Sequence, residues 1–312
     1  MKVTLLAGGT GGTKLAHGFS MLEGVELTVI ANVGDDVELH GLHVSPDIDA
    51  LLYTLSGLID ADRGWGVRDD THTAHAMLER YGGPTWFTIG DADMATNVER
   101  TRRLREGERL TDATDAMASA LGIGTRILPA TDDRYRTLVE TDEGTLAFQD
   151  YYVRRRQEPE VRGVRFEGDA HPTADVLAAI GAADLLVIGP SNPFVSIGPT
   201  VELPGVREAL MTATASKVAV SPIVGGRALK GPADRMLTSM GHASSAVGVA
   251  RIHAGFIERF VLDETDAALA PAVEGLGMEA DVMPTVMVTD ADREALARRI
   301  LALAEDRDML TG

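Results

Sequence analysis

A run of glycine and threonine near the start of the chain has the composition of a phosphate-binding loop. Four glycines and two threonines occupy residues 8–13, between a short apolar run, Val3 to Ala7, and an expected helix. Glycine lets the backbone approach an anion closely, and the free N–H groups and positive end of a helix attract it. We therefore expect a nucleotide or diphosphate ligand here, held by Gly9, Thr10, Gly11, Gly12, Thr13 and Lys14.

The loop differs from both common nucleotide-binding patterns. Thr13 stands where a Walker loop has its second glycine, and Leu15 stands where that loop has serine or threonine. Neither Gly9 nor Gly11 begins a complete Gly-x-Gly-x-x-Gly pattern, which disfavours a standard dinucleotide site. A tight turn without a ligand is the alternative, but such a turn needs fewer glycines. The composition therefore favours phosphate binding of another kind.

Four aspartates form a second candidate group. Asp35 and Asp36 follow an expected buried strand, and Asp47 and Asp49 lie in the first turn of a helix that Ser45 should cap. Mg²⁺ is commonly held by one or two carboxylates together with phosphate oxygens. We expect Asp35 and Asp49 to bind Mg²⁺, and Asp47 and Asp49 to act in catalysis. The alternative is that Asp47 complements the helix dipole and that Asp35 and Asp36 are turn residues, which we favour for Asp36 alone.

These groups need a scaffold that brings distant loops together. Strand-like and helical segments alternate along the chain, which predicts an α/β fold with a doubly wound, mostly parallel sheet. Ligands of such sheets bind beyond the carboxyl ends of the strands. Because Ser191 and Asn192 follow a buried strand, we expect them to reach the same site and to bind a phosphate or a base edge. Buried strands are expected at residues 3–7, 27–33, 184–189, 218–220 and 260–262, and a closing helix at 291–304.

The segment between the early and late strands is expected to form a smaller unit. Residues 56–124 are predicted to be a mainly helical cap or insert, with one short strand at 85–89. Residues 1–55 and 125–312 are then predicted to form the nucleotide-binding core.

Two smaller features complete the expected scaffold. A hairpin is predicted at residues 136–148, with its turn at Asp142-Glu143-Gly144. The aromatic residues Tyr53, Trp65 and Trp86 are expected in the hydrophobic core, because large aromatic side chains are buried more often than they bind ligands.

Composition excludes several classes of protein. The 312 residues are 45% hydrophobic and include no cysteine, so the chain can bury a large core but cannot form disulfides or thiolate metal sites. No apolar run approaches the length needed to cross a membrane. The net charge of −18 at pH 7 repels nucleic acids and anionic membrane surfaces. We expect a cytoplasmic enzyme that binds neither nucleic acid nor membrane.

Lysine is scarce in this acidic chain. Among 29 basic residues the lysines are Lys2, Lys14, Lys217 and Lys230. An excess of acid with arginine in place of lysine is typical of adaptation to high salt, where screening weakens the repulsion between like charges. We predict a halophilic, haloarchaeal source and an activity that rises with KCl into the molar range. Maximal activity and full stability at low salt, or a urea midpoint that does not respond to salt, would contradict this prediction.

Taken together, the motifs resemble those of one known family. They are Gly-Gly-Thr-Gly-Gly-Thr-Lys-Leu at 8–15, Asn-Val-Gly-Asp-Asp at 32–36, Ser-Pro-Asp-Ile-Asp at 45–49, Gly-Asp at 90–91, Leu-Pro-Ala-Thr-Asp-Asp at 128–133 and Gly-Pro-Ser-Asn-Pro at 189–193. Their order and spacing, from Met1 to about Asp290, are similar to those of the 2-phospho-L-lactate transferases of deazaflavin coenzyme F-420 biosynthesis.

The resemblance implies a Rossmann-like core with a smaller helical domain, assembled as a homodimer. It also implies a reaction in which a lactyl or enolpyruvyl diphospho-guanosine donates its phospho-acid group to the terminal ribityl hydroxyl of the deazaflavin Fo, and GMP is released with Mg²⁺ present. Carried over by position, the loop from Gly9 to Lys14 with Ser191 and Asn192 would hold the guanosine diphosphate part. Asp49 would lie at the Fo and metal centre, and Asp91 would belong to the binding site.

Ala92 departs from the family pattern, which has an arginine after Gly90-Asp91. The nearby candidates to replace its contact are Arg100, Arg102 and Arg103. Non-enzymatic nucleotide-sugar-binding regulators are an alternative, since they share the glycine loop and the core. They carry a Gly-Gly-Ser-Ser-Gly-type run where this chain has Val37 to Gly41, which favours the enzyme. A generic nucleotidyl- or sugar-phosphate transferase is a third reading, and the sequence is compatible with a lactate, enolpyruvate or glycerate donor.

Overall fold

A seven-stranded parallel sheet forms the centre of the computed structural model, which describes residues 1–311 and the side chains of residues 1–305. Its strands are β1 (Lys2–Ala7), β2 (Glu26–Ala31), β5 (Arg126–Pro129), β9 (Leu185–Ile188), β10 (Ser216–Val220), β13 (Arg259–Leu262) and β14 (Glu279–Val282). They are arranged in the order β14-β13-β10-β9-β1-β2-β5, and every neighbouring pair is parallel. The predicted α/β fold with a doubly wound sheet is therefore confirmed, and the five expected buried strands are all present.

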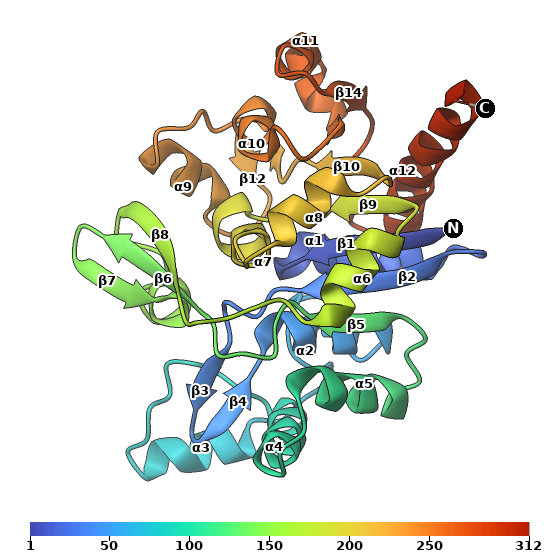
Figure 1. Cartoon of the computed structure of the whole chain (residues 1–312). Coiled ribbons are helices and arrows are strands. Elements are labelled where there is room, and N and C mark those ends of the chain that lie inside the picture. The colour runs from blue at the N-terminus through green and yellow to red at the C-terminus, as the bar shows by residue number, and fades with distance from the viewer. Residues whose placement is uncertain (312) are drawn as a thin grey trace.

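Helices cover both faces of this sheet (Figure 1). One group comprises α1 (Gly9–Ser20), α2 (Pro46–Leu55) and α12 (Asp290–Thr311), of which α1 contacts both others. The other group comprises α6 (Ala174–Ala182), α7 (Gly198–Val201) and α8 (Val206–Thr212), and Figure 1 shows α6 and α8 in front of the sheet. The helices α10 (Ala246–His253) and α11 (Ala270–Glu274), with the short η3 (Glu264–Leu269), surround the strands near the C-terminus. Within the described residues, none of the helices has the length and apolar character that crossing a membrane requires.

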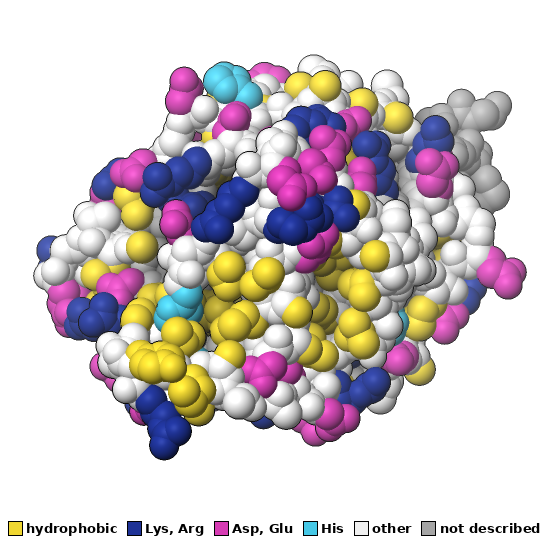
Figure 2. All heavy atoms as spheres, turned by 90° about the horizontal axis from the view of Figure 1, so that it is seen from below, with side chains coloured by type: hydrophobic (Ala, Val, Ile, Leu, Met, Phe, Trp, Pro, Cys, Tyr) yellow, Lys and Arg dark blue, Asp and Glu magenta, His cyan; other side chains and the backbone are white. Residues whose placement is uncertain are grey.

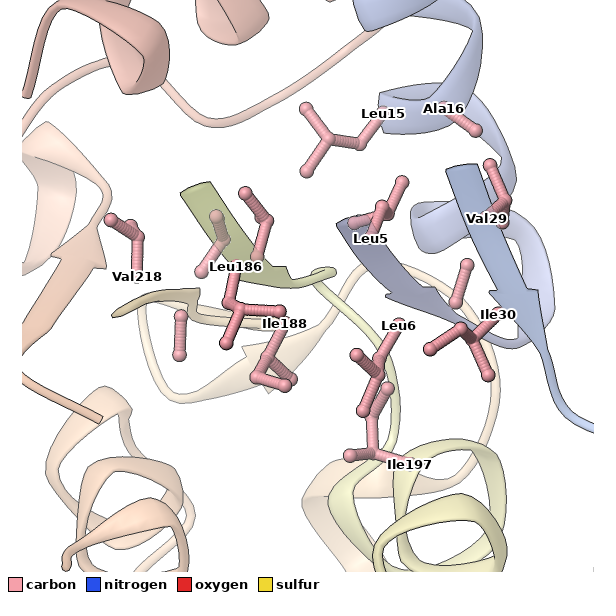
Figure 3. Close-up of a cluster of buried hydrophobic side chains, with 14 of the residues drawn as sticks. Leu5, Leu6, Leu15, Ala16, Val29, Ile30, Leu186, Ile188, Ile197 and Val218 are labelled. Carbon is pink, nitrogen blue, oxygen red and sulfur yellow. The ribbon is translucent and has the colours of Figure 1, made fainter. Parts of the chain in front are cut away.

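The central strands are apolar along their whole length because both of their faces are covered. Leu5 and Leu6 on β1 and Leu186 and Ile188 on β9 are at most 1% exposed. In Figure 3, Leu6 points toward Ile197 on one face of the sheet, and Leu5 points toward Leu15 of α1 on the other. Burying each such side chain contributes roughly 1.5–3 kcal/mol, so β1 and β9 are firmly fixed. The loops that leave these two strands therefore start from a rigid base.

The order of the strands reverses between β1 and β9. The chain runs outward from β1 to β2 and β5 on one side, and from β9 to β10, β13 and β14 on the other. The glycine loop follows β1 and the loop at Gly189–Asn192 follows β9, so both start at the same edge of the sheet. Ligands of doubly wound sheets bind at such a switch point.

The segment from 56 to 124 contains three helices, α3 (Thr73–Arg80), α4 (Asp91–Arg105) and α5 (Leu110–Ala120). The predicted strand at 85–89 is wrong, because residues 85–89 pair with no strand. Its aromatic side chains, Trp86 and Phe87, instead pack with Ile89 on the small hairpin of β3 (Val37–Leu39) and β4 (Leu42–Val44). Figure 1 shows α3, α4 and this hairpin together below the sheet, and α5 contacts β5 at the sheet's edge.

A second, antiparallel sheet lies beside the main one (Figure 1). β6 (Arg136–Thr141) and β7 (Gly144–Ala147) form the predicted hairpin, with Asp142 and Glu143 between them. The sequence analysis missed its third strand, β8 (Val161–Glu167), whose alternation is broken by Gly163. The remaining elements are η1 (Asp150–Arg154), η2 (Pro193–Ile197), β11 (Ile223–Val224), β12 (Arg227–Ala228) and α9 (Ala233–Ser239).

Candidate active site

A cavity of about 610 Å³ lies at the switch point of the sheet. Its walls come from the loops after β1, β2 and β9, from the first two turns of α2, and from segments of the 60s, 80s and 220s that approach it. Nine of the predicted site residues line it: Gly9, Thr10, Gly11, Lys14, Asp35, Asp47, Asp49, Ser191 and Asn192. Gly12, Thr13 and Asp91 do not belong to this lining. The structure thus brings together side chains from loops that are far apart in the sequence.

The glycine loop presents its backbone to the cavity. α1 begins at Gly9, whose φ of +65° lies in the left-handed region that favours glycine. Gly9 N donates to Asp47 Oδ1 at 2.6 Å. An anionic oxygen therefore already lies at this helix N-terminus, as the helix dipole favours. Thr13 Oγ1 donates to Gly9 O at 3.0 Å, so Thr13 holds the first turn of the helix instead of facing the cavity.

Two glycines of the loop are needed for close packing as well. A Cβ on Gly11 would lie 2.0 Å from Pro190 O, and a Cβ on Gly12 would lie 2.9 Å from both Ala7 Cβ and Ser191 Oγ. Neither distance is possible for a real side chain. The sequence predicted glycine for the approach of a phosphate, whereas the structure shows that these glycines also let α1 lie directly against the loop after β9.

Replacing Gly11 with alanine is therefore expected to damage both the fold and the site. The new methyl group must displace Pro190 and the backbone that carries Ser191, at a cost of about 1–3 kcal/mol or more. Urea unfolding should show this loss, and calorimetry should show weaker GDP binding. Gly181→Ala is the matched control, because a Cβ on Gly181 meets nothing within 4 Å and alanine favours the helix. Wild-type stability with wild-type GDP affinity in Gly11→Ala would contradict the packing role.

Asp35 and Asp47 form a pair of buried carboxylates on one wall. Asp35 is 8% and Asp47 is 6% exposed, and Asp35 Oδ1 has no hydrogen-bond partner among the described residues. Burial and the neighbouring Asp47 raise the pKa of Asp35 well above its usual range. Burial also raises the pKa of Asp47 to about 6, although Gly9 and Asn32 donate hydrogen bonds that oppose the change. Two crowded carboxylates with an unpaired oxygen fit a divalent cation.

Asp49, which was expected to bind Mg²⁺, is paired with an arginine. Its Oδ1 contacts Nη2 of Arg100 closely and its Oδ2 lies 3.3 Å from Nη1, so the guanidinium spans both oxygens. The Arg100 side chain is fully buried. Burial raises the pKa of Asp49, and the charge and hydrogen bonds of Arg100 oppose that change. Because both oxygens already face a cation, Asp49 is a poorer metal ligand than the sequence predicted.

Asp36 has the structural role that the sequence analysis favoured, but not as a simple turn residue. Ser45, expected to cap α2, instead donates from Oγ to Asp36 Oδ2 at 2.7 Å. His43 Nε2 lies 2.8 Å from the same oxygen. Asp36 therefore connects the β3–β4 hairpin to the start of α2 and takes no part in lining the cavity.

The loop after β9 contributes both predicted residues to the lining. Ser191 Oγ is buried and has no partner among the described residues, so this hydroxyl is available to a ligand. Asn192 accepts a hydrogen bond from Phe194 N at 2.9 Å and thereby caps η2. Lys14 Nζ donates to Met287 O at 2.7 Å, and burial together with the charges of Arg293 and Lys230 lowers the pKa of Lys14.

Asp91 lies outside the cavity. Its carboxylate accepts hydrogen bonds from Thr71 Oγ1 and from the backbone N–H groups of Thr73 and Ala74, which start α3. These bonds lower the pKa of Asp91 to about 2. The expected place of Asp91 in the binding site is therefore not seen, because its two oxygens are used to begin a helix.

The three arginines considered as replacements for the family arginine lie elsewhere. Arg100 is held by Asp49 and does not line the cavity. Arg102 and Arg103 pair with Glu99 and other acidic residues on the outer face of α4. No described arginine lines the cavity near Ala92.

Sequence analysis missed several lining residues. Trp65 is not in the core but is 45% exposed at the cavity, between Gly64 and Gly66, which both have φ of +71°. Those flanking glycines were a signal for an exposed turn. Tyr53 is buried as expected, but its position in the lining follows from the face of α2 that carries Asp49. The other lining residues that were missed include Phe87, Asp93, Phe148, Tyr152 and Lys230.

These features define a class: a doubly wound α/β protein whose ligand site combines a glycine loop, a carboxylate pair and a serine at the switch point. Residues 3–300 match the 2-phospho-L-lactate transferase CofD family, so the chain belongs to that family, as the motifs had indicated. A phosphoenolpyruvate transferase from Streptomyces griseus is 41% identical over 98% of this chain and 99% of the relative. A 2-phospho-L-lactate transferase from Methanothermobacter thermautotrophicus is 40% identical over 96% of this chain and 97% of the relative.

A solved structure shares the fold at much lower identity. A UPF0052 family protein from Bacillus halodurans matches with a TM-score of 0.67 and 18% identity, and covers 96% of this chain and 98% of its own. At this identity the likeness concerns the fold alone. It agrees with the seven-stranded arrangement described above.

Proposed function

We propose that this transferase moves a phospholactyl or phosphoenolpyruvyl group from a guanosine diphospho-acid donor to the deazaflavin Fo, and that GMP is released. Family membership supports the type of reaction, and relatives named for each of the two acid groups are nearly equally similar. The observation that carries the proposal is the unpaired Asp35 Oδ1 beside Asp47, next to the glycine loop. A site of that kind suits a diphosphate bound together with a cation.

In this proposal Asp35 and Asp47 would hold Mg²⁺, which neutralises charge on the donor's diphosphate. We propose Asp47 in place of Asp49 in that pair, because Arg100 already spans the oxygens of Asp49. Asp49 instead joins α2 to α4 at one end of the cavity through its contact with Arg100. The metal that the family resemblance implies and the unpaired oxygen of Asp35 both support this position.

The remaining polar groups would position the donor. Thr10 and Gly11 lie at the N-terminus of α1, where backbone N–H groups and the helix dipole attract phosphate. The free hydroxyl of Ser191 would donate to a phosphate oxygen, and Lys14 adds a positive charge at the same wall. Holding the diphosphate rigidly lets a hydroxyl attack the phosphorus in line with the departing GMP oxygen.

A direct assay tests the proposal. The protein is mixed with Fo, MgCl₂ and, in separate reactions, the lactyl, enolpyruvyl and glyceryl guanosine diphosphates, and products are identified by mass. We expect GMP and one phospho-acid ester of Fo. Nucleotide binding without GMP release from any donor would support the regulator, and release of another nucleotide from a sugar-phosphate donor would support the generic transferase.

We also propose that the protein is cytoplasmic, as its composition suggests, and that it is a homodimer, as the family resemblance implies. Figure 2 shows hydrophobic side chains gathered between charged groups on the face below the sheet, which is the kind of surface that a partner subunit covers. Light scattering in 2 M KCl should give about twice the chain mass of 33.1 kDa. A monomer at micromolar concentration would overturn this assembly.

A further inference from the structure

Asp93 lines the cavity and has no part in the proposed binding of the donor or the cation. It lies in the first turn of α4, and it lines the cavity from a different segment than the glycine loop and the Asp35–Asp47 pair. Asp93 Oδ1 accepts a hydrogen bond from Tyr53 OH at 2.8 Å. Asp93 N donates to Asp70 Oδ2 at 3.0 Å, which fixes the backbone below the side chain. The carboxylate is therefore held in one position.

Four described carboxylates line the cavity, and the proposed function already gives three of them another role. Asp47 accepts from Gly9 and Asn32, and lies with Asp35 where we place the cation. Asp49 is bound by Arg100. Asp93 has only neutral hydrogen-bond donors, the Tyr53 hydroxyl and a long contact of 3.5 Å from Asn97 Nδ2. It is thus the carboxylate that remains able to accept a proton.

The position of the Tyr53–Asp93 pair relative to Asp47 suits such a role. Asp47 and Tyr53 both line the cavity and are six residues apart on this helix, a rise of about 9 Å. Asp47 marks the end at which the diphosphate binds, and the Tyr53–Asp93 pair marks the other. A phosphoryl group and an attacking hydroxyl, each adding about 3 Å, fit between these two points.

We propose that Asp93 is the general base of the transfer, an inference that rests on the proposed function. The ribityl oxygen of Fo forms a bond to the phosphorus that carries the acid group, and the bond from that phosphorus to the GMP oxygen breaks. GMP leaves with the electron pair of the broken bond. The proton of the hydroxyl passes to the Asp93 carboxylate, which returns it to water after the product leaves. Tyr53 positions Asp93 through its hydrogen bond.

The surroundings of Asp93 are compatible with this task. Burial and the charge of Asp49 raise the pKa of Asp93 to about 6, while the Tyr53 hydroxyl and Arg100 act in the opposite direction and Asp70 adds to the increase. These are the titratable groups of α2, α4 and the loop before α4 that face it. A base is most effective when its pKa is near the working pH.

The test compares Asp93→Asn, Asp93→Glu and Tyr53→Phe with the wild type in the mass assay. Asp93→Asn should lower kcat by about 10²- to 10⁴-fold, the usual contribution of a general base, while calorimetric affinities for GDP and Fo stay within about threefold. Glu99→Gln is the matched control, since it makes the same change on the outer face of α4 and should leave kcat unchanged.

The pH profile gives a second readout that a merely structural residue would not move. In the wild type, kcat should fall below about pH 6 as Asp93 becomes protonated. Asp93→Asn should lack this fall. Tyr53→Phe removes a donor that favours the ionised carboxylate, so the fall should move to higher pH. Asp93→Glu keeps a carboxylate and should therefore have a higher kcat than Asp93→Asn.

Three results would overturn the inference. They are a wild-type kcat in Asp93→Asn, a loss confined to the KM for Fo, and an acid limb that Tyr53→Phe leaves unchanged. If the wild type transfers no group to Fo, the proposed function fails and this role fails with it. If the wild type is active and only the Asp93 results disagree, the role of Asp93 fails alone.

Discussion

Replacing Asp35 with asparagine is expected to stabilise the metal-free protein, abolish its response to Mg²⁺ and lower kcat by about 10²-fold or more. The stability effect follows from burial beside Asp47, which raises the pKa of Asp35 in the folded state. A raised carboxyl pKa means that the folded protein loses stability as pH rises from the unfolded value through the folded one. Asparagine cannot ionise, so this loss is absent from the variant.

Thermal unfolding in EDTA and in 10 mM MgCl₂ measures both effects. At pH 8 in EDTA the variant should melt above the wild type, and the difference should shrink toward pH 4. Mg²⁺ should raise the melting temperature of the wild type alone, because a ligand that binds the folded state stabilises it. Asp112→Asn, an exposed change on α5, should behave as wild type. If Asp35→Asn melts lower in EDTA and still responds to Mg²⁺, then Asp35 does not hold the cation.

The sheet and its switch point could be predicted because their determinants are local. Apolar runs such as that of β1 are long enough to identify a buried strand, and a parallel sheet places the loops after β1 and β9 at one edge. The same reasoning predicted that Ser191 lies at the same site as the glycine loop. The family resemblance rests on all the motifs taken together, because no single loop identifies the family.

The errors concern contacts between segments that lie far apart in the chain. The run at 85–89 has the composition of a strand, yet its aromatic side chains find a packing site on the β3–β4 hairpin instead of a pairing partner. Glycines at 11 and 12 suggested phosphate approach, and the sequence did not reveal that they also avoid atoms of Pro190 and Ala7. These packing constraints depend on residues that are distant in the sequence, so the local sequence does not reveal them.

The contact of Asp49 with Arg100 could not be predicted for the same reason. Its partner, Arg100, is 51 residues away and is a member of an arginine-rich helix whose other arginines face solvent. Nothing in the spacing of α4 distinguishes Arg100 except that it falls on the inner face of the helix with Asn97. The presence of a carboxylate cluster could therefore be predicted from the sequence, whereas the pairing of Asp49 with Arg100 could not.

Replacing Arg100 with methionine should give the largest loss of stability of any single change to the site, about 3–5 kcal/mol. Arg100 is fully buried and joins α4 to α2 through Asp49, so the variant leaves a buried carboxylate without its counter-charge. Without Arg100, burial raises the pKa of Asp49 further. The loss of stability is therefore greatest at high pH, and it shrinks as the pH falls and the carboxyl group becomes protonated.

A double-mutant cycle in urea separates the ion pair from the packing. Arg100→Met with Asp49→Leu should recover most of the lost stability, because an apolar pair of similar size can replace a buried ion pair with little net change. Arg102→Met is the control on the same helix; its exposed pairs with Glu99 and Glu106 should be worth at most about 1 kcal/mol. If Arg100→Met is no more destabilising than Arg102→Met, the guanidinium does not neutralise Asp49, and that carboxylate becomes available again as a ligand for the cation.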